Sequence, residues 1–151
     1  MSTTTPDALA GAVYDRLKAS PAFPAGLTLL DHDLLPVEQG QDGDLKVGGV
    51  YLVEDRPLGD PSDTLGTASQ LRVATVRVEF RIKAAADTRY HEATRPFREW
   101  ALGVLMADTT LGGLAEDTAF NTYTPFGLAS NIRIAGADLD FELHYLFRPI
   151  P

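Results

Sequence analysis

The fold is decided by residues 71–83, Leu71-Arg-Val-Ala-Thr-Val-Arg-Val-Glu-Phe-Arg-Ile-Lys83, in which apolar and polar side chains alternate. A period of two is typical of a strand with one face on the core and one face towards water. The sequence therefore predicts a strand over 71–83. Its core face carries Ala74, Val76, Val78, Phe80 and Ile82, and its polar face carries Thr75, Arg77, Glu79, Arg81 and Lys83.

A second strand is predicted over 138–148 by the same alternation. The side chains that face one way are Leu139, Phe141, Leu143, Tyr145 and Phe147, while Asp140, Glu142, His144 and Arg148 mostly face the other way. Because the two patterns match, we expect both strands to line one apolar layer.

Two helices are expected beside these strands. Thr5-Pro6-Asp7 combines a cap, a first-turn proline and an acidic side chain at the positive helix end, and the helix should end near Ser20-Pro21. The second helix should start at an Asp87 cap, with a kink or a fresh start at Pro96. Its apolar positions at helical spacing are Tyr90, Thr94, Phe97, Ala101, Val104 and Leu105.

The second helix should end in a double-glycine turn within Asp108-Thr-Thr-Leu-Gly-Gly-Leu114. Glycine adopts positive φ at little cost, so Gly112 and Gly113 are interpreted as a structural turn. A ligand site is disfavoured there because the glycines follow a helix, whereas anions bind where a helix begins.

The rest of the chain gives weaker signals. Short strands are expected at 27–30 and 50–54, with long loops at about 31–49 and 55–70, and 116–136 is ambiguous apart from a short strand near Ile132–Ile134. One-sided amphipathic strands with helices suit an α+β fold. We predict a single domain over 1–151, with an antiparallel or mixed sheet and helices packed on one face.

Charge and composition narrow the function classes. The 151 residues include no cysteine, which excludes disulfides and thiolate chemistry, and the net charge is −8. The segment from Asp31 to Asp63 contains nine acidic residues and only two basic ones, Lys46 and Arg56. Such a surface repels a phosphate backbone, so a tight grip on nucleic acid is not expected. The sequence also lacks a signal-peptide pattern or an apolar run of membrane-spanning length, and we expect a soluble chain made in the cytoplasm.

No catalytic residue, cofactor site or metal site is predicted. Asp31-His32-Asp33 could imitate a metal cluster, but a solvated acidic turn is preferred because neighbouring loop residues do not converge on one ion by spacing alone. The glycine pairs lack the Lys-Ser/Thr of a phosphate-binding loop. Glu54-Asp55 is the best carboxylate pair, and it has no apolar pocket wall in the sequence to raise a pKa.

A resemblance carries the functional expectation. The strand 71–82, the helix ending in Val104-Leu-Met-Ala-Asp-Thr-Thr-Leu-Gly-Gly-Leu114, and the strand Ala137-Asp-Leu-Asp-Phe-Glu-Leu-His-Tyr-Leu-Phe-Arg148 follow one another in order. This resembles the tail-terminator (minor tail protein U-like) family of tailed bacteriophages and phage-like particles. The likeness covers roughly residues 71–148.

The resemblance implies a structural protein of the virion tail, assembled in the cytoplasm of the bacterial host. Its subunits form a hexameric ring that caps the tail tube, stops tube polymerisation and presents a surface to the head-side connector. The implied partners are the chain itself, the tail-tube protein and the connector protein, with DNA passing through without specific binding. A head–tail connector or tail-tube subunit is the nearest alternative, and a small ligand-binding domain is a more distant one.

Two surfaces follow from a ring. A lumen lined with carboxylates would keep DNA centred and unbound, and Asp42, Asp44, Asp60 and Asp63 are the candidates for it. The alternative hypothesis, that these carboxylates only keep exposed loops hydrated, stays open. Arg77, Arg81 and Lys83 are expected to turn towards a neighbouring subunit or a cross-strand partner.

Overall fold

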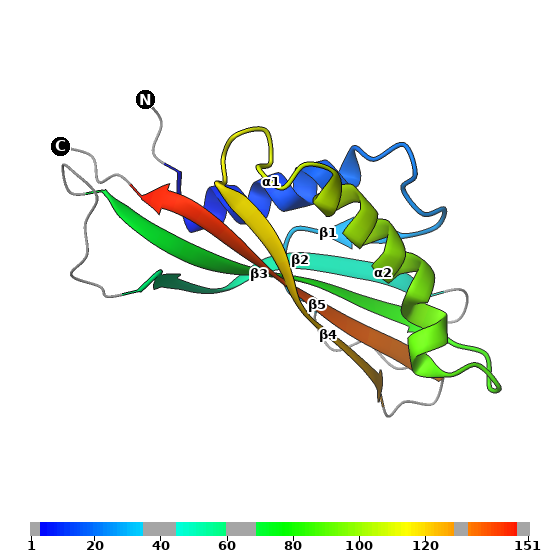
Figure 1. The fold of residues 1–151 in the computed structure, drawn as a ribbon. Helices are drawn as coiled ribbons and strands as arrows, with labels where there is room; N and C mark the ends of the chain where they lie inside the picture. Colours follow the sequence, from blue (N-terminus) through cyan, green and yellow to red (C-terminus); the bar gives the residue numbers. More distant parts are fainter. Residues whose placement is uncertain (1–3, 35–44, 60–68, 129–132, 148–151) are drawn as a thin grey trace.

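The computed structural model describes residues 4–34, 45–59, 69–128 and 133–147 (Figure 1). The elements follow one another along the chain as α1 (Pro6–Lys18), β1 (Thr28–Leu30), β2 (Lys46–Pro57), β3 (Gln70–Lys83), α2 (Tyr90–Ala107), β4 (Asp117–Leu128) and β5 (Ile134–Phe147).

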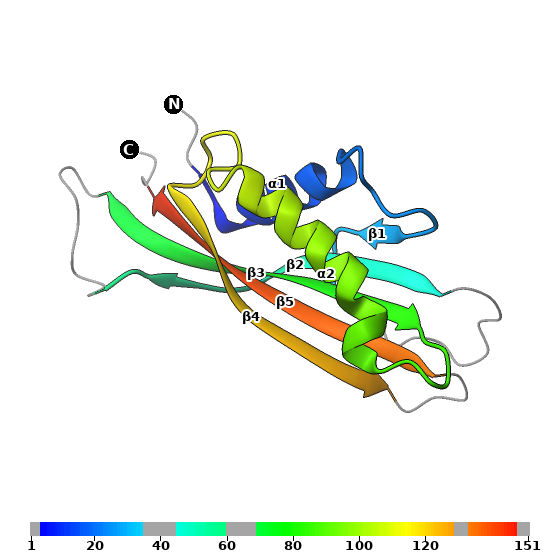
Figure 2. The ribbon, with the colours of Figure 1, turned by 45° about the vertical axis from the view of Figure 1, so that its right-hand side comes forward.

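The five strands form one mixed sheet in the order β1-β2-β3-β5-β4. β1 runs parallel to β2, and every other neighbouring pair is antiparallel. Both helices lie on the same face of the sheet, as two views of the ribbon show (Figures 1 and 2). The predicted α+β class, with a mixed sheet and helices on one face, is confirmed.

The core lies between this sheet face and the helices. The matched apolar rows of β3 and β5 are confirmed as buried, except for Phe147, which is only partly buried. The rows lie side by side in one sheet, with Val76 opposite Phe141 and Val78 opposite Leu139. The helices cover this layer with one apolar stripe each, made of Leu9, Val13 and Leu17 in α1 and Phe97, Ala101 and Leu105 in α2. Trp100 and Val104 pack at its margin.

The prediction for the second strand was too short. β2 begins at Lys46 and ends at Pro57, so both expected loops lose residues to it. Gly48 and Gly49 fall within the loop expected at about 31–49, but these glycines permit close packing inside the strand. A Cβ on Gly48 would lie 3.0 Å from the Leu29 side chain, and one on Gly49 would lie 2.5 Å from the His32 carbonyl oxygen.

β4 was not predicted. It lies at the edge of the sheet, where Pro125 and Gly127 are tolerated, and its register with β5 shifts between Phe120 and Thr122. These features interrupt the alternation on which a strand prediction depends. The strand expected near 132–134 is replaced by the start of β5 at Ile134, and Ile132 is outside the described residues.

The helix starts were predicted with mixed success. Thr5 caps α1, and its side-chain hydroxyl accepts a hydrogen bond from the Ala8 amide at 3.1 Å, as expected. Asp87 is not the cap of α2, because the N-cap is Arg89 and no side chain caps that end. Pro96 lies inside α2, which is assigned as one helix from Tyr90 to Ala107, so no new helix starts there. No helix in the described ranges is both long and apolar enough to cross a membrane.

Candidate functional site

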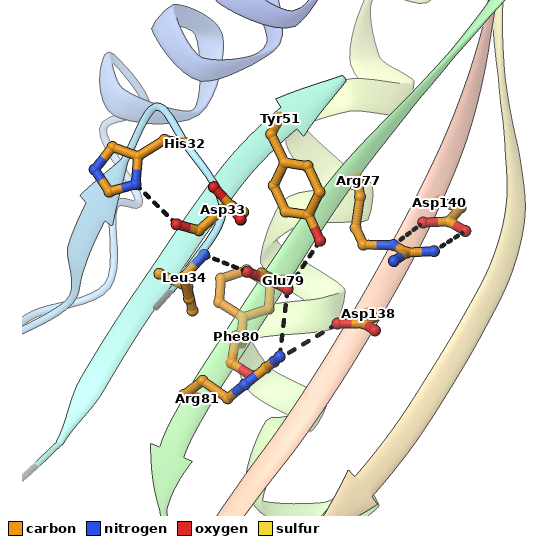
Figure 3. Close-up of polar contacts among 10 residues, drawn as sticks. All are labelled: His32, Asp33, Leu34, Tyr51, Arg77, Glu79, Phe80, Arg81, Asp138 and Asp140. Atoms are coloured by element: carbon orange, nitrogen blue, oxygen red, sulfur yellow. Dashed lines mark hydrogen bonds and ion pairs between the residues drawn. The ribbon is translucent and has the colours of Figure 1, made fainter. Parts of the chain in front are cut away.

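The sheet face opposite the helices is charged. Strand alternation directs the polar side chains of β3 and β5 to this face, and the register places Arg77 between Tyr51 and Asp140 and Glu79 opposite Asp138 (Figure 3). We call this surface the charged face, and its central members are Tyr51, Arg77, Glu79, Arg81, Asp138 and Asp140.

Glu79 joins three separate segments. Its side chain accepts hydrogen bonds from the Leu34 amide at 2.6 Å and from the Tyr51 hydroxyl at 3.1 Å, and it pairs with Arg81 at 3.3 Å (Figure 3). Glu79 is only 4% exposed. A buried carboxylate needs several hydrogen-bond donors, and these three contacts supply them. Because one donor is the Leu34 amide, Glu79 holds the segment after β1 against the central strand β3.

Arg77 and Asp140 form a bidentate pair. Arg77 Nε lies 2.7 Å from Asp140 Oδ1, and Nη2 lies 3.1 Å from Oδ2. The hydrogen bonds to Asp140 raise the pKa of Arg77 above its ordinary value. Burial raises the pKa of Tyr51, which favours the protonated hydroxyl that donates to Glu79.

Arg81 lies between two carboxylates. It pairs with Glu79, and its Nη1 lies 3.6 Å from Asp138 Oδ1, while its guanidinium stacks 4.6 Å from the centre of the Phe126 ring. Burial raises the pKa of Asp138 in spite of this neighbour. The charged face thus pairs most of its charges within itself, while Asp138 Oδ1 is buried with no hydrogen-bond partner among the described residues.

A second polar cluster lies on the helix-facing side, at the end of β2. The register of β2 shifts at Val53, which places Asp55 on the same face as Tyr145. The Tyr145 hydroxyl donates to Asp55 at 2.7 Å, and Arg72 Nε donates to the other Asp55 oxygen at 3.0 Å. Burial first, and then the bond to Asp55, raises the pKa of Tyr145 to about 12.

The double-glycine turn has the geometry expected of it. Leu111, Gly112 and Gly113 all have positive φ, at +50°, +70° and +96°. Asp108 holds the turn, because its carboxylate accepts from Thr110 and from the Gly112 amide, and it pairs with Arg16 of α1 at 3.2 Å. The hydrogen bond from the Thr110 side chain, and then those from the two amides, lower the pKa of Asp108 to about 2.

The other candidates fall in different places. Arg77 and Arg81 have cross-strand partners, one of the two outcomes expected of them, and Lys83 is exposed at the end of β3. The four candidate lumen residues, Asp42, Asp44, Asp60 and Asp63, lie outside the described residues. Sequence reasoning missed the roles of Asp55 and Glu79, because both depend on strand register.

The acidic segment after β1 borders an open hollow. Asp31, His32 and Asp33 face Asp7 and Ala10 of α1 across it, and β2 forms its floor with Val50, Tyr51 and Leu52. His32 Nδ1 lies 2.8 Å from the Asp33 carbonyl oxygen. Within the described part of the chain, no three His, Asp or Glu side chains are placed to hold a metal ion.

Comparisons with known proteins give this chain no family. A scan against models of protein families finds no match, and a search of curated proteins finds none either.

Proposed function

We propose that this chain is a structural subunit of the tail of a tailed phage or phage-like particle. In this role it is a tail terminator, whose ring caps the tail tube, ends its polymerisation and presents the surface that joins the head. Its partners are then further copies of itself, the tail-tube protein and the connector.

The observation that supports the proposal is the arrangement of β3, α2, the turn and β5. These four elements, which carry the resemblance, form one packed unit in which β3 and β5 are neighbours and α2 covers both. The turn is tied to α1 through Arg16 and Asp108. The elements that carry the resemblance therefore pack as one structural unit. A subunit that assembles with its neighbours into a ring needs such a rigid unit.

The charged face also favours a structural role. Its acids and bases pair with one another, along β3 between Arg81 and Glu79 and across to β5 at Asp138 and Asp140. An active site more often holds a perturbed group in a cleft beside a reaction partner. The second polar cluster is likewise occupied, since Asp55 accepts from both Arg72 and Tyr145.

A tail-tube subunit is the second candidate, and one observation favours it. The paired ends of β2 and β3, where Pro57 lies opposite Arg72, extend beyond the helices in both views (Figures 1 and 2). A tube protein would use a projecting hairpin for contact between successive rings. A terminator should instead stop the tube after one layer.

Electron microscopy of the purified chain, alone and with the tail-tube protein of the same particle, tests both candidates. A terminator should form single rings and should cap tubes at one end, which shortens them as its concentration rises. A tube subunit should stack into tubes by itself. A chain that stays monomeric at every concentration and leaves tubes uncapped would contradict the proposal.

The lumen hypothesis has its own test. If Asp42, Asp44, Asp60 and Asp63 line the lumen, replacing all four by lysine should leave ring formation intact and slow DNA ejection, because each cation adds affinity for phosphate. Normal DNA ejection by particles that carry the variant would contradict the lumen hypothesis and favour the alternative, in which the four carboxylates only keep exposed loops hydrated.

A further inference from the structure

We propose that the two edges of the sheet are the two halves of one head-to-tail contact between copies of this chain. On one copy the contact uses β2 beyond its pairing with β1, and on the next copy it uses β4. This inference rests on the proposed function, because a ring needs such a repeated contact, and it names the surfaces that make it.

Both edges are open among the described residues. β1 pairs only with Val47, Gly48 and Gly49, so no described strand pairs with β2 on that side from Val50 to Pro57, and the segment Asp31–Asp33 borders only the hollow at Val50–Leu52. At the opposite edge, β4 pairs with β5 and has no strand beyond it in the described sheet (Figure 2). Open strand edges are sites where chains associate.

Each edge exposes a large apolar side chain, and the two lie at the same level of the sheet. Val53 is 43% exposed on β2, and Phe120 is 37% exposed on β4. The register runs from Leu52, the residue before Val53, through Val76 and Phe141 to Phe120. Two copies placed edge to edge at equal height therefore bring the backbone of Val53 level with that of Phe120 of the next copy. Phe120 lies on the helix-facing side beside Phe141, and Val53 follows the helix-facing Leu52 at the register shift, so each side chain covers a different side of the joined edges.

The two edges carry complementary charges next to the level of Val53 and Phe120. The hollow beside β2 carries the exposed carboxylates of Asp7, Asp31 and Asp33. On the β4 side, Arg98 of α2 stacks 4.6 Å from the centre of the Tyr123 ring. No ion pair joins any of these four charged residues to another described residue.

Strand register places the two charged groups opposite each other. Tyr123 pairs with Leu139, Leu139 with Val78, and Val78 with Val50, which forms part of the floor of the hollow. Arg98 of one copy thus meets the acidic hollow of the next. Opposite charges across an interface fix its register and select the correct partner.

The orientation suits a repeated contact. β4 runs antiparallel to β2, because three antiparallel pairings separate them, so equally oriented copies meet edge to edge as antiparallel strands. A head-to-tail contact closes into a ring when its rotation permits. The register shifts beside Val53 and Asn121 limit continuous backbone pairing, so side chains should supply most of the specificity.

The test is a pair of charge-reversed variants of the full chain. Arg98→Glu places a negative charge against the hollow, and the double variant Asp31→Lys with Asp33→Lys reverses the hollow itself. In sedimentation velocity over a concentration series, each variant alone should need about tenfold more protein for half-assembly. Mixing the two variants should restore assembly, because every contact in an alternating ring is then between opposite charges.

Val53→Lys places a charge in the open edge of β2 and should also raise the concentration needed for half-assembly. The exposed position of Val53 makes misfolding a poor explanation of any loss. The matched control is Glu99→Lys, a charge reversal at an exposed position of α2, and it should assemble like the wild type. Lys83→Glu tests the rival surface on the central strand β3, and the edge contact predicts no effect there. Rings that form equally with Arg98→Glu, or that only Lys83→Glu disrupts, overturn the edge contact and leave the proposed function intact. A wild-type chain that never assembles contradicts both.

Discussion

Arg77 and Asp140 are joined by two short contacts, Nε to Oδ1 at 2.7 Å and Nη2 to Oδ2 at 3.1 Å, across the two central strands. The Thr122 hydroxyl on β4 donates to the same carboxylate at 3.4 Å. Because the pair lies over the middle of the charged face, it locks β3, β5 and β4 in a single register. A planar guanidinium matches a carboxylate in a way that an ammonium group cannot.

Replacing Arg77 by alanine should lower the free energy of unfolding by about 1–3 kcal/mol, because Asp140 loses a bidentate partner in a partly buried site. The control is Arg56→Ala, which removes a single contact at 3.3 Å from the more exposed pair Arg56–Glu142. Its loss should be below about 1 kcal/mol. Urea unfolding measures both, and equal losses would show that the two-point geometry adds nothing.

Stability should fall at high pH because of Tyr145. Its folded pKa of about 12 exceeds the ordinary value of 10.0, so the folded state holds the phenol proton more tightly than the unfolded state. The stabilisation is complete below pH 10 and is lost as the pH rises towards 12. Urea unfolding from pH 8 to pH 12 should show a shallower decline for Tyr145→Phe than for the wild type. An unchanged slope would mean that the Tyr145 hydroxyl is not held buried beside Asp55 in solution.

Stability at low pH should depend on Asp108. Its folded pKa of about 2 is below the ordinary value of 3.8, so its contribution is present above pH 4 and is lost as the pH falls towards 2. Asp108→Asn should flatten the decline in melting temperature across that window. Asp7→Asn, an exposed acid in the first turn of α1, is the comparison, and a similar flattening there would deny Asp108 a special role.

Core truncations should distinguish the buried centre of the sheet from its exposed edge. Phe80 and Phe141 are fully buried, so replacing either by alanine should cost about 3–5 kcal/mol, from lost burial and the cavity that remains. Phe120→Ala, at the exposed edge, should cost clearly less, although the Phe120 ring lies 5.5 Å from that of Phe141. Denaturant unfolding compares the three, and losses below about 1 kcal/mol at both buried sites would reverse the assigned faces.

The main elements could be predicted because local patterns decide them. The alternation around Phe80 and Phe141 and the capped start at Thr5 depend on residues close together in the chain, and they agree with the structure. β4 and the first residues of β2 could not be predicted. Pro125 and Gly48 oppose strand formation locally, and only pairing with a distant strand offsets them.

The polar contacts needed information that the sequence does not contain. Arg77 was expected to have a partner, but choosing Asp140 over its neighbours requires the exact β3–β5 register. Asp55 reaches Tyr145 only because the register shift at Val53 moves it to the helix-facing side. A shift of one residue exchanges the two faces of a strand, so alternation cannot predict such contacts without the bulge.

Glycines in α2 and in the following turn should respond to alanine in opposite directions. Gly113 has φ +96° with no atom within 4 Å of an added Cβ, so Gly113→Ala introduces backbone strain without a clash, and we expect a loss of about 1 kcal/mol or more. Gly103 is an exposed position inside α2 with equally open surroundings. Alanine suits a helix better than glycine, so Gly103→Ala should stabilise the fold by about 0.5–1 kcal/mol. Urea unfolding of the two variants, each of which adds one methyl group, measures whether the free energy of unfolding falls or rises. A stabilising Gly113→Ala would show that the turn does not keep its left-handed backbone, and the structural reason for the double glycine would be lost.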